Sequence, residues 1–311
     1  MVKKVFIDGS AGTTGLRIAE RLESRNDIEL IKLTEENRKD TNARKKALNE
    51  ADIAFLCLPD AAAVEAISLI ENDKTVVLDT STAHRTNPDF AYGFPELSAE
   101  FEQKIKTVNR IAVPGCHASG FISLIYPLVE KGIISKDILL SCFSLTGYSG
   151  GGKKMIAEYE DAEREELLNA PRQYGLSQKH KHLPEMTAVT GIENAPAFIP
   201  VVDDFYSGME VTVPLFASQL NTGFTVEDIK NAYKEKYNGP IVKYVEEFDE
   251  GGFVSANKLS FKDSMEISVS GNDDRILLIS RYDNLGKGAS GAAVECMNIV
   301  LGVDKTTGLE L

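Results

Sequence analysis

The sequence predicts an α/β protein in which a parallel sheet, covered by helices on both faces, is followed by a second region of mostly antiparallel strands. Three observations support this fold class. Short apolar runs alternate with helical patterns over the first third of the chain, as is typical of parallel strands joined by crossover helices. A glycine-rich turn follows the first apolar run. After about residue 135, strand patterns and a hairpin signal dominate.

The elements of the first region can be placed in order along the chain. Residues 5–8 form a short apolar run, and residues 14–25 then carry apolar side chains at near-helical spacing. The later apolar runs have the length of buried strands, and the stretches between them are helical in pattern. We therefore predict strands at 5–8, 28–33, 53–58, 75–78 and 110–113, and helices at 14–25, 43–51 and 61–70. This alternation is the Rossmann pattern.

The second region has a different character, because its strands follow one another with fewer helices between them. Gly271-Asn272-Asp273-Asp274 separates two strand patterns and is a hairpin signal. We predict strands at 138–146, 187–192, 210–216, 241–245, 265–270 and 275–282, and helices at 153–168, 225–237 and 289–301. The result is an α+β domain with a mostly antiparallel sheet.

Composition and charge exclude several classes of function. The 311-residue chain has a net charge of -13, which argues against nucleic acid or an anionic membrane as its main partner and leaves a small molecule. No apolar run approaches the ~18 residues of a membrane span, and the N-terminus lacks the pattern of a signal peptide. The cysteines are far apart, without metal-ligand spacing. We expect a cytoplasmic chain with reduced thiols and no bound metal.

The glycine-rich turn predicts a dinucleotide site. It joins the first strand to the first helix and reads Gly9-Ser10-Ala11-Gly12-Thr13-Thr14-Gly15. Glycines let the backbone approach a pyrophosphate, while the helix N-terminus offers free N–H groups and a partial positive charge. After the second strand, Arg38 could neutralise a 2′-phosphate, so we favour NADP over NAD. The alternative is that Arg38 and Lys39 belong to a solvated turn.

Cys116 is the candidate nucleophile. Residues 110–120 have the pattern of a strand, a sharp turn and a helix, which places Cys116 near a helix N-terminus, where the dipole lowers a thiol pKa. Ligands of parallel-sheet proteins also bind at the carboxyl ends of strands. Cys57, Cys142 and Cys296 occupy apolar or helical settings, which favours a packing role.

His180, His182 and Glu185 lie within six residues and could supply the proton transfer that a nucleophilic cysteine needs. In this arrangement the carboxylate would orient an imidazole. A His-x-His pair can also bind a metal, although no third ligand follows at convincing spacing. A solvated polar loop is the simpler alternative. His84 and His117 are weaker candidates, and His117 could simply line the pocket.

Two further segments suggest anion binding. Arg85 closes a polar stretch that begins at Ser81, and its guanidinium could hold a phosphate through two parallel hydrogen bonds. The turn formed by Ser149, Gly150, Gly151, Gly152 and Lys153 opens a helix and is a second potential anion site. Either segment could instead be a simple turn.

Taken together, these segments resemble the N-acetyl-gamma-glutamyl-phosphate reductases of arginine biosynthesis, in particular their shorter form (type 2). The resemblance extends over nearly the whole chain, and the order of the pieces makes it specific. The pieces are Gly9–Gly15, Asp79–Arg85, Gly93–Leu97, Pro114–Cys116, Ser149–Lys153, His180–Glu185 and Asp283–Gly291.

The resemblance implies a fold like that of aspartate-semialdehyde dehydrogenase and glyceraldehyde-phosphate dehydrogenase, in which the last helix returns to the nucleotide domain. The implied boundaries are 1–115 with 286–311 for the NADP-binding domain, and 116–285 for a catalytic and oligomerisation domain. Cys116 is then the nucleophile and His182 the acid/base, with His180 as the alternative. Ser81 and Gly288 join the cofactor contacts. The chain departs from the longer form at 198–214, where an Arg-Gly is missing, so the residues that bind the substrate carboxylate cannot be carried over.

The implied reaction is the NADPH-dependent conversion of N-acetyl-gamma-glutamyl phosphate to N-acetyl-glutamate 5-semialdehyde through a cysteine thioester. Within the same chemistry, the alternatives are an aspartate-semialdehyde dehydrogenase or a reductase of amino-adipyl phosphate. A non-catalytic NADP-binding redox sensor is an alternative of another class. The related enzymes are homo-oligomers, so we expect a tetramer or dimer.

Overall fold

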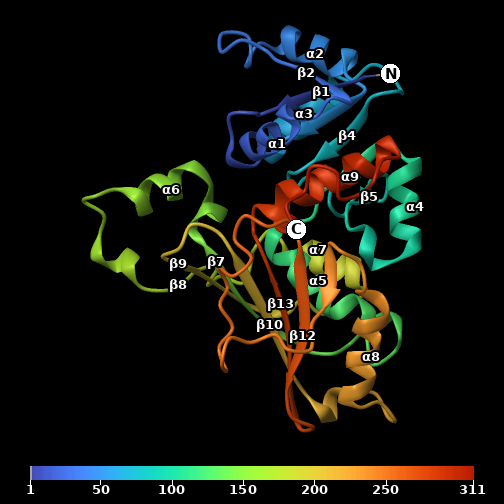
Figure 1. Cartoon of the computed structure of the whole chain (residues 1–311), viewed down its shortest axis with the longest axis vertical. Helices are drawn as coiled ribbons and strands as arrows, with labels where there is room; N and C mark the ends of the chain where they lie inside the picture. Colours follow the sequence, from blue (N-terminus) through green and yellow to red (C-terminus); the bar gives the residue numbers. More distant parts are fainter. Residues whose placement is uncertain (1) are drawn as a thin grey trace. The chain divides into compact units, whose positions relative to one another are not determined.

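The computed structural model describes residues 2–311, which divide into two compact units. Unit 1 takes the chain up to Gly115 together with Ala289–Leu309, and unit 2 comprises Cys116–Gly288 with the last two residues. Each unit contains one sheet and its own helices (Figure 1). The chain therefore leaves unit 1 immediately before Cys116.

The sheet of unit 1 is entirely parallel, as the apolar runs predict. Its strand order is β2-β1-β3-β4-β6-β5, and every neighbouring pair runs in the same direction. The strands are β1 (Lys3–Asp8), β2 (Ile28–Ile31), β3 (Ile53–Leu56), β4 (Val76–Asp79), β5 (Ala91–Tyr92) and β6 (Arg110–Ala112). Because parallel strands all end at the same edge, the residues after Asp8, Leu56, Asp79 and Ala112 gather there.

Helices cover both faces of this sheet, and the alternation of side chains shows which helix lies on which face. Val5 and Ile7 pack in one core cluster with α1 (Thr13–Glu23), α4 (Ala99–Thr107) and α9 (Gly291–Leu301). Phe6, between them, packs in a second cluster with α2 (Thr41–Glu50) and α3 (Asp60–Ser68). The predicted return of the last helix to the N-terminal domain is thereby confirmed.

The sheet of unit 2 is mixed and mostly antiparallel. Its order is β11-β12-β13-β10-β7-β9-β8, in which β11–β12 and β7–β9 are parallel and the other pairs are antiparallel. The strands are β7 (Ser141–Gly147), β8 (Arg172–Gln173), β9 (Ala197–Asp203), β10 (Met209–Phe216), β11 (Val242–Tyr244), β12 (Met265–Gly271) and β13 (Arg275–Tyr282). The predicted hairpin joins β12 to β13, closed by Asn272 N–H donating to the Arg275 carbonyl (2.9 Å).

The helices of unit 2 are α5 (Cys116–Glu130), α6 (Gly152–Glu160), α7 (Leu183–Thr190) and α8 (Val226–Lys236). α5 packs on β10 and β13 and also contacts α7 and α8, so it is buried along most of its length. Pro127 lies inside α5 and has no N–H for the Ser123 carbonyl. The hydroxyl of Tyr237 donates to that carbonyl instead (2.6 Å). α6 and its neighbouring loops extend away from the sheet (Figure 1).

Two predicted elements of unit 2 are wrong. Residues 187–192 form the second half of α7 and its C-terminal turn rather than a strand, and Gly191 ends the helix at φ 75°. The strand of this region is β9, which we did not predict. The predicted helix at 153–168 ends at Glu160, because Asp161 is extended, and a short 3-10 turn follows at Glu166–Asn169.

The lengths and apolar character of the helices bear on membrane insertion. Within residues 2–311, no helix is both long enough and apolar enough to cross a membrane.

Candidate active site

The glycine turn of unit 1 depends on the absence of side chains. Gly9 follows β1 with φ 87°, and a Cβ there would lie 2.2 Å from the Cys57 carbonyl oxygen. A Cβ on Gly15 would lie 2.5 Å from the Gly9 carbonyl oxygen, and Gly12 N–H donates to that same oxygen (2.9 Å). The turn is therefore tight, and it leads directly into α1, whose first N–H groups have no intrahelical acceptor.

Thr13, at the start of α1, adds a side-chain donor to this turn. Its hydroxyl oxygen is buried and has no hydrogen-bond partner within residues 2–311. A buried hydroxyl without a partner is costly unless a bound group satisfies it. The turn thus has the features that fit a pyrophosphate: a close backbone approach, free helix N–H groups and an unused hydroxyl.

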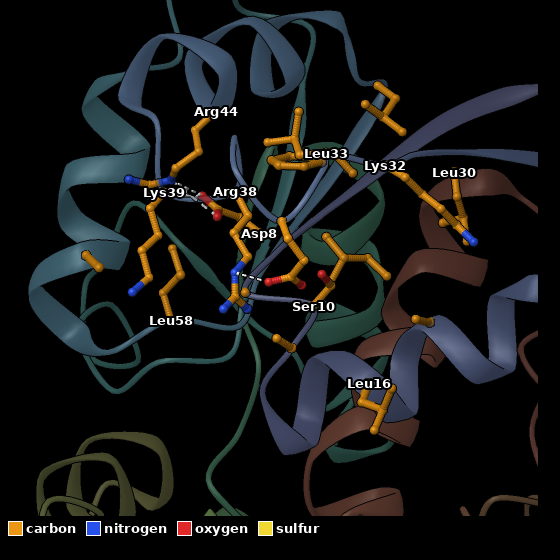
Figure 2. Close-up of a pocket in the computed structure, with 18 of the residues that line it drawn as sticks. Asp8, Ser10, Leu16, Leu30, Lys32, Leu33, Arg38, Lys39, Arg44 and Leu58 are labelled. Carbon is orange, nitrogen blue, oxygen red and sulfur yellow. Dashed lines mark hydrogen bonds and ion pairs between the residues drawn. The ribbon is translucent and has the colours of Figure 1, made fainter. Parts of the chain in front are cut away.

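A cavity of about 550 Å³ extends from this turn within unit 1 (Figure 2). The turn residues Gly9, Ser10 and Ala11 line it, together with the predicted Arg38. The Arg38 guanidinium contacts the Glu35 carboxylate (2.8 Å) and remains partly exposed. Other lining side chains include Leu16, Leu30, Lys32, Lys39 and Leu58. The cavity combines apolar walls with cationic groups, which suits an adenosine that carries an additional phosphate.

Arg44 and Asp8 form a buried ion pair in the wall of the same cavity (Figure 2). Arg44 Nε lies 3.0 Å from Asp8 Oδ2, and its Nη1 donates to Glu65 (2.9 Å). Burial raises the pKa of the Asp8 carboxyl, and the bonds and charge of Arg44 oppose that effect. Sequence analysis missed Arg44, because it lies in the middle of a polar helix with no motif around it.

Ser81 and Arg85 lie beyond the end of β4 in unit 1. The Ser81 hydroxyl donates to Asp79 (2.8 Å), and His84 Nδ1 lies 2.6 Å from the same carboxylate. Arg85 donates to the carbonyls of Val113 and Thr80, each at 2.9 Å. The Arg85 guanidinium therefore holds together the ends of the neighbouring strands β4 and β6.

Cys116 is the first residue of α5 and is partly exposed. The hydroxyl of Tyr282 donates to the Cys116 carbonyl (2.6 Å) and accepts from Gly120 N–H (3.1 Å), so the phenol bridges the first turn of the helix. The free N–H groups and the dipole of a helix N-terminus favour a thiolate at such a position. By contrast, burial raises the pKa of the Cys57 thiol to about 12, and it raises the pKa of Cys142 as well.

His117, beside the candidate nucleophile, is the centre of an aromatic cluster in unit 2. Its Nδ1 lies 2.7 Å from Ser144 Oγ and its Nε2 lies 2.6 Å from Tyr174 Oη. Burial, with a smaller effect of His180, lowers the pKa of His117 to about 3. The ring is therefore neutral at physiological pH and has a hydrogen bond at each nitrogen, a role that the sequence did not reveal.

The other two histidines of the predicted site pack around His117. The ring centres of His180 and His182 lie 5.4 and 5.6 Å from that of His117, and 4.7 Å from each other. His182 precedes α7, and its N–H donates to His180 Nδ1 (3.2 Å). Glu185 is buried in the first turn of α7. Because α7 packs against α5, the structure brings the histidine segment to the helix that begins at Cys116.

The second predicted anion turn also lies in unit 2. Ser149 and Gly150 belong to a 3-10 turn, and Lys153 follows in the first turn of α6. The side chain of Asn284 donates to Ser149 Oγ (3.0 Å). Gly288 lies against the candidate nucleophile, because a Cβ on it would be 3.0 Å from Cys116 Cβ. Within residues 2–311, no three His, Cys, Asp or Glu side chains are arranged to hold a metal ion.

Comparison with known proteins identifies the family. The semialdehyde dehydrogenase NAD binding domain matches residues 4–105, and the semialdehyde dehydrogenase dimerisation domain matches residues 116–284. The chain is 42% identical over 308 residues to N-acetyl-gamma-glutamyl-phosphate reductase of Sinorhizobium medicae, covering 97% of this chain and 99% of the relative. The Brucella ovis protein of the same name is 43% identical, over 97% of this chain and 100% of its own. The chain belongs to the N-acetyl-gamma-glutamyl-phosphate reductase family.

Solved structures agree with this family at the level of the fold. Aspartate semialdehyde dehydrogenase II of Vibrio cholerae has a TM-score of 0.72 at 16% identity, over 97% of this chain and 99% of its own. Aspartate semialdehyde dehydrogenase of Candida albicans, solved with NADP, has a TM-score of 0.68 at 17% identity, over 99% and 100%. The resemblance to the N-acetyl-gamma-glutamyl-phosphate reductases that the motifs indicated is confirmed. The glycine turn falls in the NAD binding match and Cys116 in the dimerisation match.

Proposed function

We propose that this chain reduces N-acetyl-gamma-glutamyl phosphate to N-acetyl-glutamate 5-semialdehyde with NADPH, as a step of arginine biosynthesis. The observation that carries the proposal is the placement of Cys116. It begins a buried helix, it is partly exposed, and it adjoins a cluster of three histidines. Relatives that are 41–43% identical over nearly their whole length bear the name of this reductase.

NADP is the cofactor, and the residues of unit 1 fit it. The N–H groups of Gly9–Gly15 and the Thr13 hydroxyl would hold the pyrophosphate, and Arg38 would face the 2′-phosphate. Ser81 and Gly288 are our further proposed contacts. When bound, NADPH supplies the hydride that reduces the acyl group.

Cys116 carries out the covalent step. Its thiolate attacks the acyl carbon, a C–S bond forms, and the C–O bond to phosphate breaks, which leaves a thioester and inorganic phosphate. The N–H groups of the first turn of α5 are placed to stabilise the oxyanion that forms during the attack. Arg85, Ser149, Gly150 and Lys153 are our proposed contacts for the phosphate.

His182 is our proposed acid/base, with His180 as the alternative and Glu185 as the group that orients the imidazole. During reduction, the protonated imidazole donates its proton to the carbonyl oxygen, which becomes the hydroxyl of the thiohemiacetal. The neutral imidazole then takes that proton back as the C–S bond breaks, which releases the aldehyde and restores the thiolate. His117 is not suited to this role, because its pKa is about 3 and both ring nitrogens are hydrogen-bonded.

We assign NADP binding to residues 1–115 and 286–311, and catalysis with oligomerisation to 116–285. The dimerisation-domain match supports a homo-oligomer, and we propose a dimer or a tetramer. On the sheet face opposite α5, Phe216 and Leu277 are exposed, which is consistent with a partner on that face. We propose a cytoplasmic location, since a catalytic thiolate needs a reducing compartment.

The test is reverse turnover: N-acetyl-glutamate semialdehyde with NADP and inorganic phosphate, beside aspartate semialdehyde under the same conditions. We expect phosphate-dependent formation of NADPH with the first substrate only. Preference for aspartate semialdehyde would contradict the proposal, as would turnover that needs no phosphate. Cys116→Ser should bind NADP and lose nearly all turnover. A variant that retained wild-type rates would exclude the thioester.

The two histidines are separated by single substitutions. His182→Asn should lower the rate at neutral pH by ~10²–10⁴ if His182 transfers the proton. His180→Asn should lower the rate by less, because this variant keeps the His182 imidazole. A larger loss in His180→Asn would transfer the role to His180.

A further inference from the structure

Asp283, immediately after β13, is a fully buried carboxylate whose oxygens accept four hydrogen bonds. Oδ2 accepts from the Ser207 hydroxyl (2.6 Å) and from Phe261 N–H. Oδ1 accepts from the N–H groups of Leu285 (2.6 Å) and Gly286 (2.9 Å). These donors come from three separate segments of unit 2, and an ionised carboxylate is the one side-chain group that accepts from all of them at once.

The backbone of Asp283 continues this arrangement to the nucleophile. Its carbonyl accepts from the N–H groups of Gly286 (3.1 Å) and Gly288 (3.0 Å), so residues 283–288 form a closed turn. Gly288 is the end of the turn that lies against Cys116, where a Cβ would be 3.0 Å from Cys116 Cβ, closer than ordinary van der Waals contact. The carboxylate of Asp283 is thereby connected, through one turn, to the side chain of Cys116.

Asn284 extends the same connection to the proposed phosphate turn. It is buried, its Oδ1 accepts from Gly208 N–H (2.9 Å), and its Nδ2 donates to Ser149 Oγ (3.0 Å). Gly208 has φ 127°, and a Cβ there would lie 2.5 Å from the Ala256 carbonyl oxygen. The Ser207–Gly208 turn is therefore tightly held, and Asn284 fixes Ser149 relative to it.

We propose that Asp283 and Asn284 are positioning residues for the reaction. Asp283 holds the Gly286–Gly288 turn against Cys116 and restricts the thiol to the N-terminus of α5. Asn284 holds the Ser149 turn in the orientation that receives phosphate. Neither side chain needs to touch the substrate. The inference rests on the proposed function, which supplies the roles of Cys116 and Ser149.

The first experiment measures the pH dependence of Cys116 alkylation by iodoacetamide, followed by peptide mapping, in Asp283→Asn. An amide in place of the carboxylate directs N–H donors at backbone N–H groups, so the turn loosens and the thiol samples positions away from the helix N-terminus. We expect the midpoint of the profile to rise by about half a pH unit or more, and kcat to fall about tenfold with the KM for NADP within about twofold.

Glu266→Gln is the matched control. Glu266 is also a buried carboxylate of unit 2, paired with Arg281 (2.9 Å), and its register with Arg281 in the β12–β13 pair places it on the sheet face away from α5. It should destabilise the protein and leave the alkylation profile unchanged. The same shift in both variants would overturn the proposal, and so would an unchanged profile in Asp283→Asn.

Ser207→Ala keeps the test valid if Asp283→Asn does not fold. It removes one of the four bonds, so the profile should shift in the same direction by a smaller amount. An unchanged profile in folded Ser207→Ala would contradict the role of Asp283. Because alkylation needs no substrate, it tests positioning even if N-acetyl-glutamate semialdehyde is not turned over, and the two failures can be told apart.

Asn284→Ala tests the second half of the proposal through a different kinetic constant. Ser149 loses its tie to Asn284, so the KM for phosphate in the reverse reaction should rise about tenfold while the KM for NADP stays within about twofold. An equal rise in both constants would indicate a general loss of structure and overturn the assignment. An unchanged KM for phosphate would do the same.

Discussion

The neutral His117 makes a quantitative prediction about stability and pH. In the folded chain, burial lowers its pKa from 6.5 to about 3. As the pH falls below the ordinary value, the unfolded chain therefore binds a proton that the folded chain does not, and protonation favours unfolding. The stabilising contribution is fully present above the ordinary pKa and is lost as the pH falls toward the folded one.

The magnitude follows from the two pKa values. A pH of about 5 is about 1.5 units below the pKa of the imidazole in the unfolded chain, so that imidazole is protonated, while the imidazole of the folded chain is still neutral. At ~1.36 kcal/mol for each unit, the protein should lose about 2 kcal/mol of unfolding free energy between about pH 7 and about pH 5 from this histidine alone. The loss depends mainly on the ordinary pKa, provided that the folded pKa lies well below 5.

Urea denaturation of the wild type and of His117→Gln at both pH values isolates this contribution. The variant should be less stable at about pH 7, because it loses the bonds to Ser144 and Tyr174. That deficit should narrow by about 2 kcal/mol at about pH 5. The pH-dependent contributions of carboxylates elsewhere cancel in the difference between the two proteins, because both proteins contain the same carboxylates.

Ile122→Val, in the buried part of the same helix, is the control. It should cost ~0.5–1.5 kcal/mol, equally at both pH values, because no titrating group changes. If the deficit of His117→Gln is also the same at both pH values, His117 titrates normally in the folded chain and the reasoning is refuted.

Three further substitutions test unit 1. Gly9→Ala should abolish NADPH binding in a fluorescence titration. It should also lower the unfolding free energy by more than the ~1–2 kcal/mol of a positive φ, since its Cβ would lie 2.2 Å from a carbonyl oxygen. The control is Gly132→Ala, which also has a positive φ but open space around it; it should lose only that ~1–2 kcal/mol and bind NADPH normally. Arg44→Met should destabilise by ~3–5 kcal/mol in thermal melts, because Asp8 is left buried without its ion partner. Arg38→Ser should weaken NADPH binding at least about tenfold and leave NADH unchanged; equal loss of both would remove Arg38 from 2′-phosphate recognition.

The parallel sheet of unit 1 could be predicted because local and tertiary signals agree there. The region around 187–200 shows the opposite case. Thr187, Val189 and Ile192 have strand propensity, yet Pro184 and Gly191 delimit a helix, and packing against α5 stabilises it. The strand β9 was missed because Pro200 interrupts its apolar run. The structure tolerates this proline because β8 pairs with β9 only at Val201 and Val202, so on that side of β9 few backbone hydrogen bonds are needed.

Candidate site residues could be proposed from the sequence where their chemistry lies within one short segment. Cys116 follows a strand and a turn, and His180 and His182 stand in one short motif. The partners of His117 could not be found in this way, because Ser144 lies 27 positions and Tyr174 lies 57 positions along the chain. Tyr282 is 166 positions from the carbonyl that it contacts. Such contacts follow from the order of strands in the sheet, which no local pattern encodes.

The groups around Cys116 differ in whether they can exchange a proton at neutral pH. Burial raises the pKa of both Tyr174 and Tyr282, and the charge of Cys116 adds to this, so the phenols remain protonated. His117 is held neutral by burial. These three groups therefore act as fixed dipoles, and they can orient the cluster without exchanging a proton at neutral pH. Within the cluster, the thiol, His180 and His182 are then our candidates for the groups that take part in proton transfer. We therefore propose the acid/base role for the His180–His182 pair and not for His117: the imidazolium would protonate the carbonyl oxygen during reduction and recover that proton as the thiohemiacetal collapses.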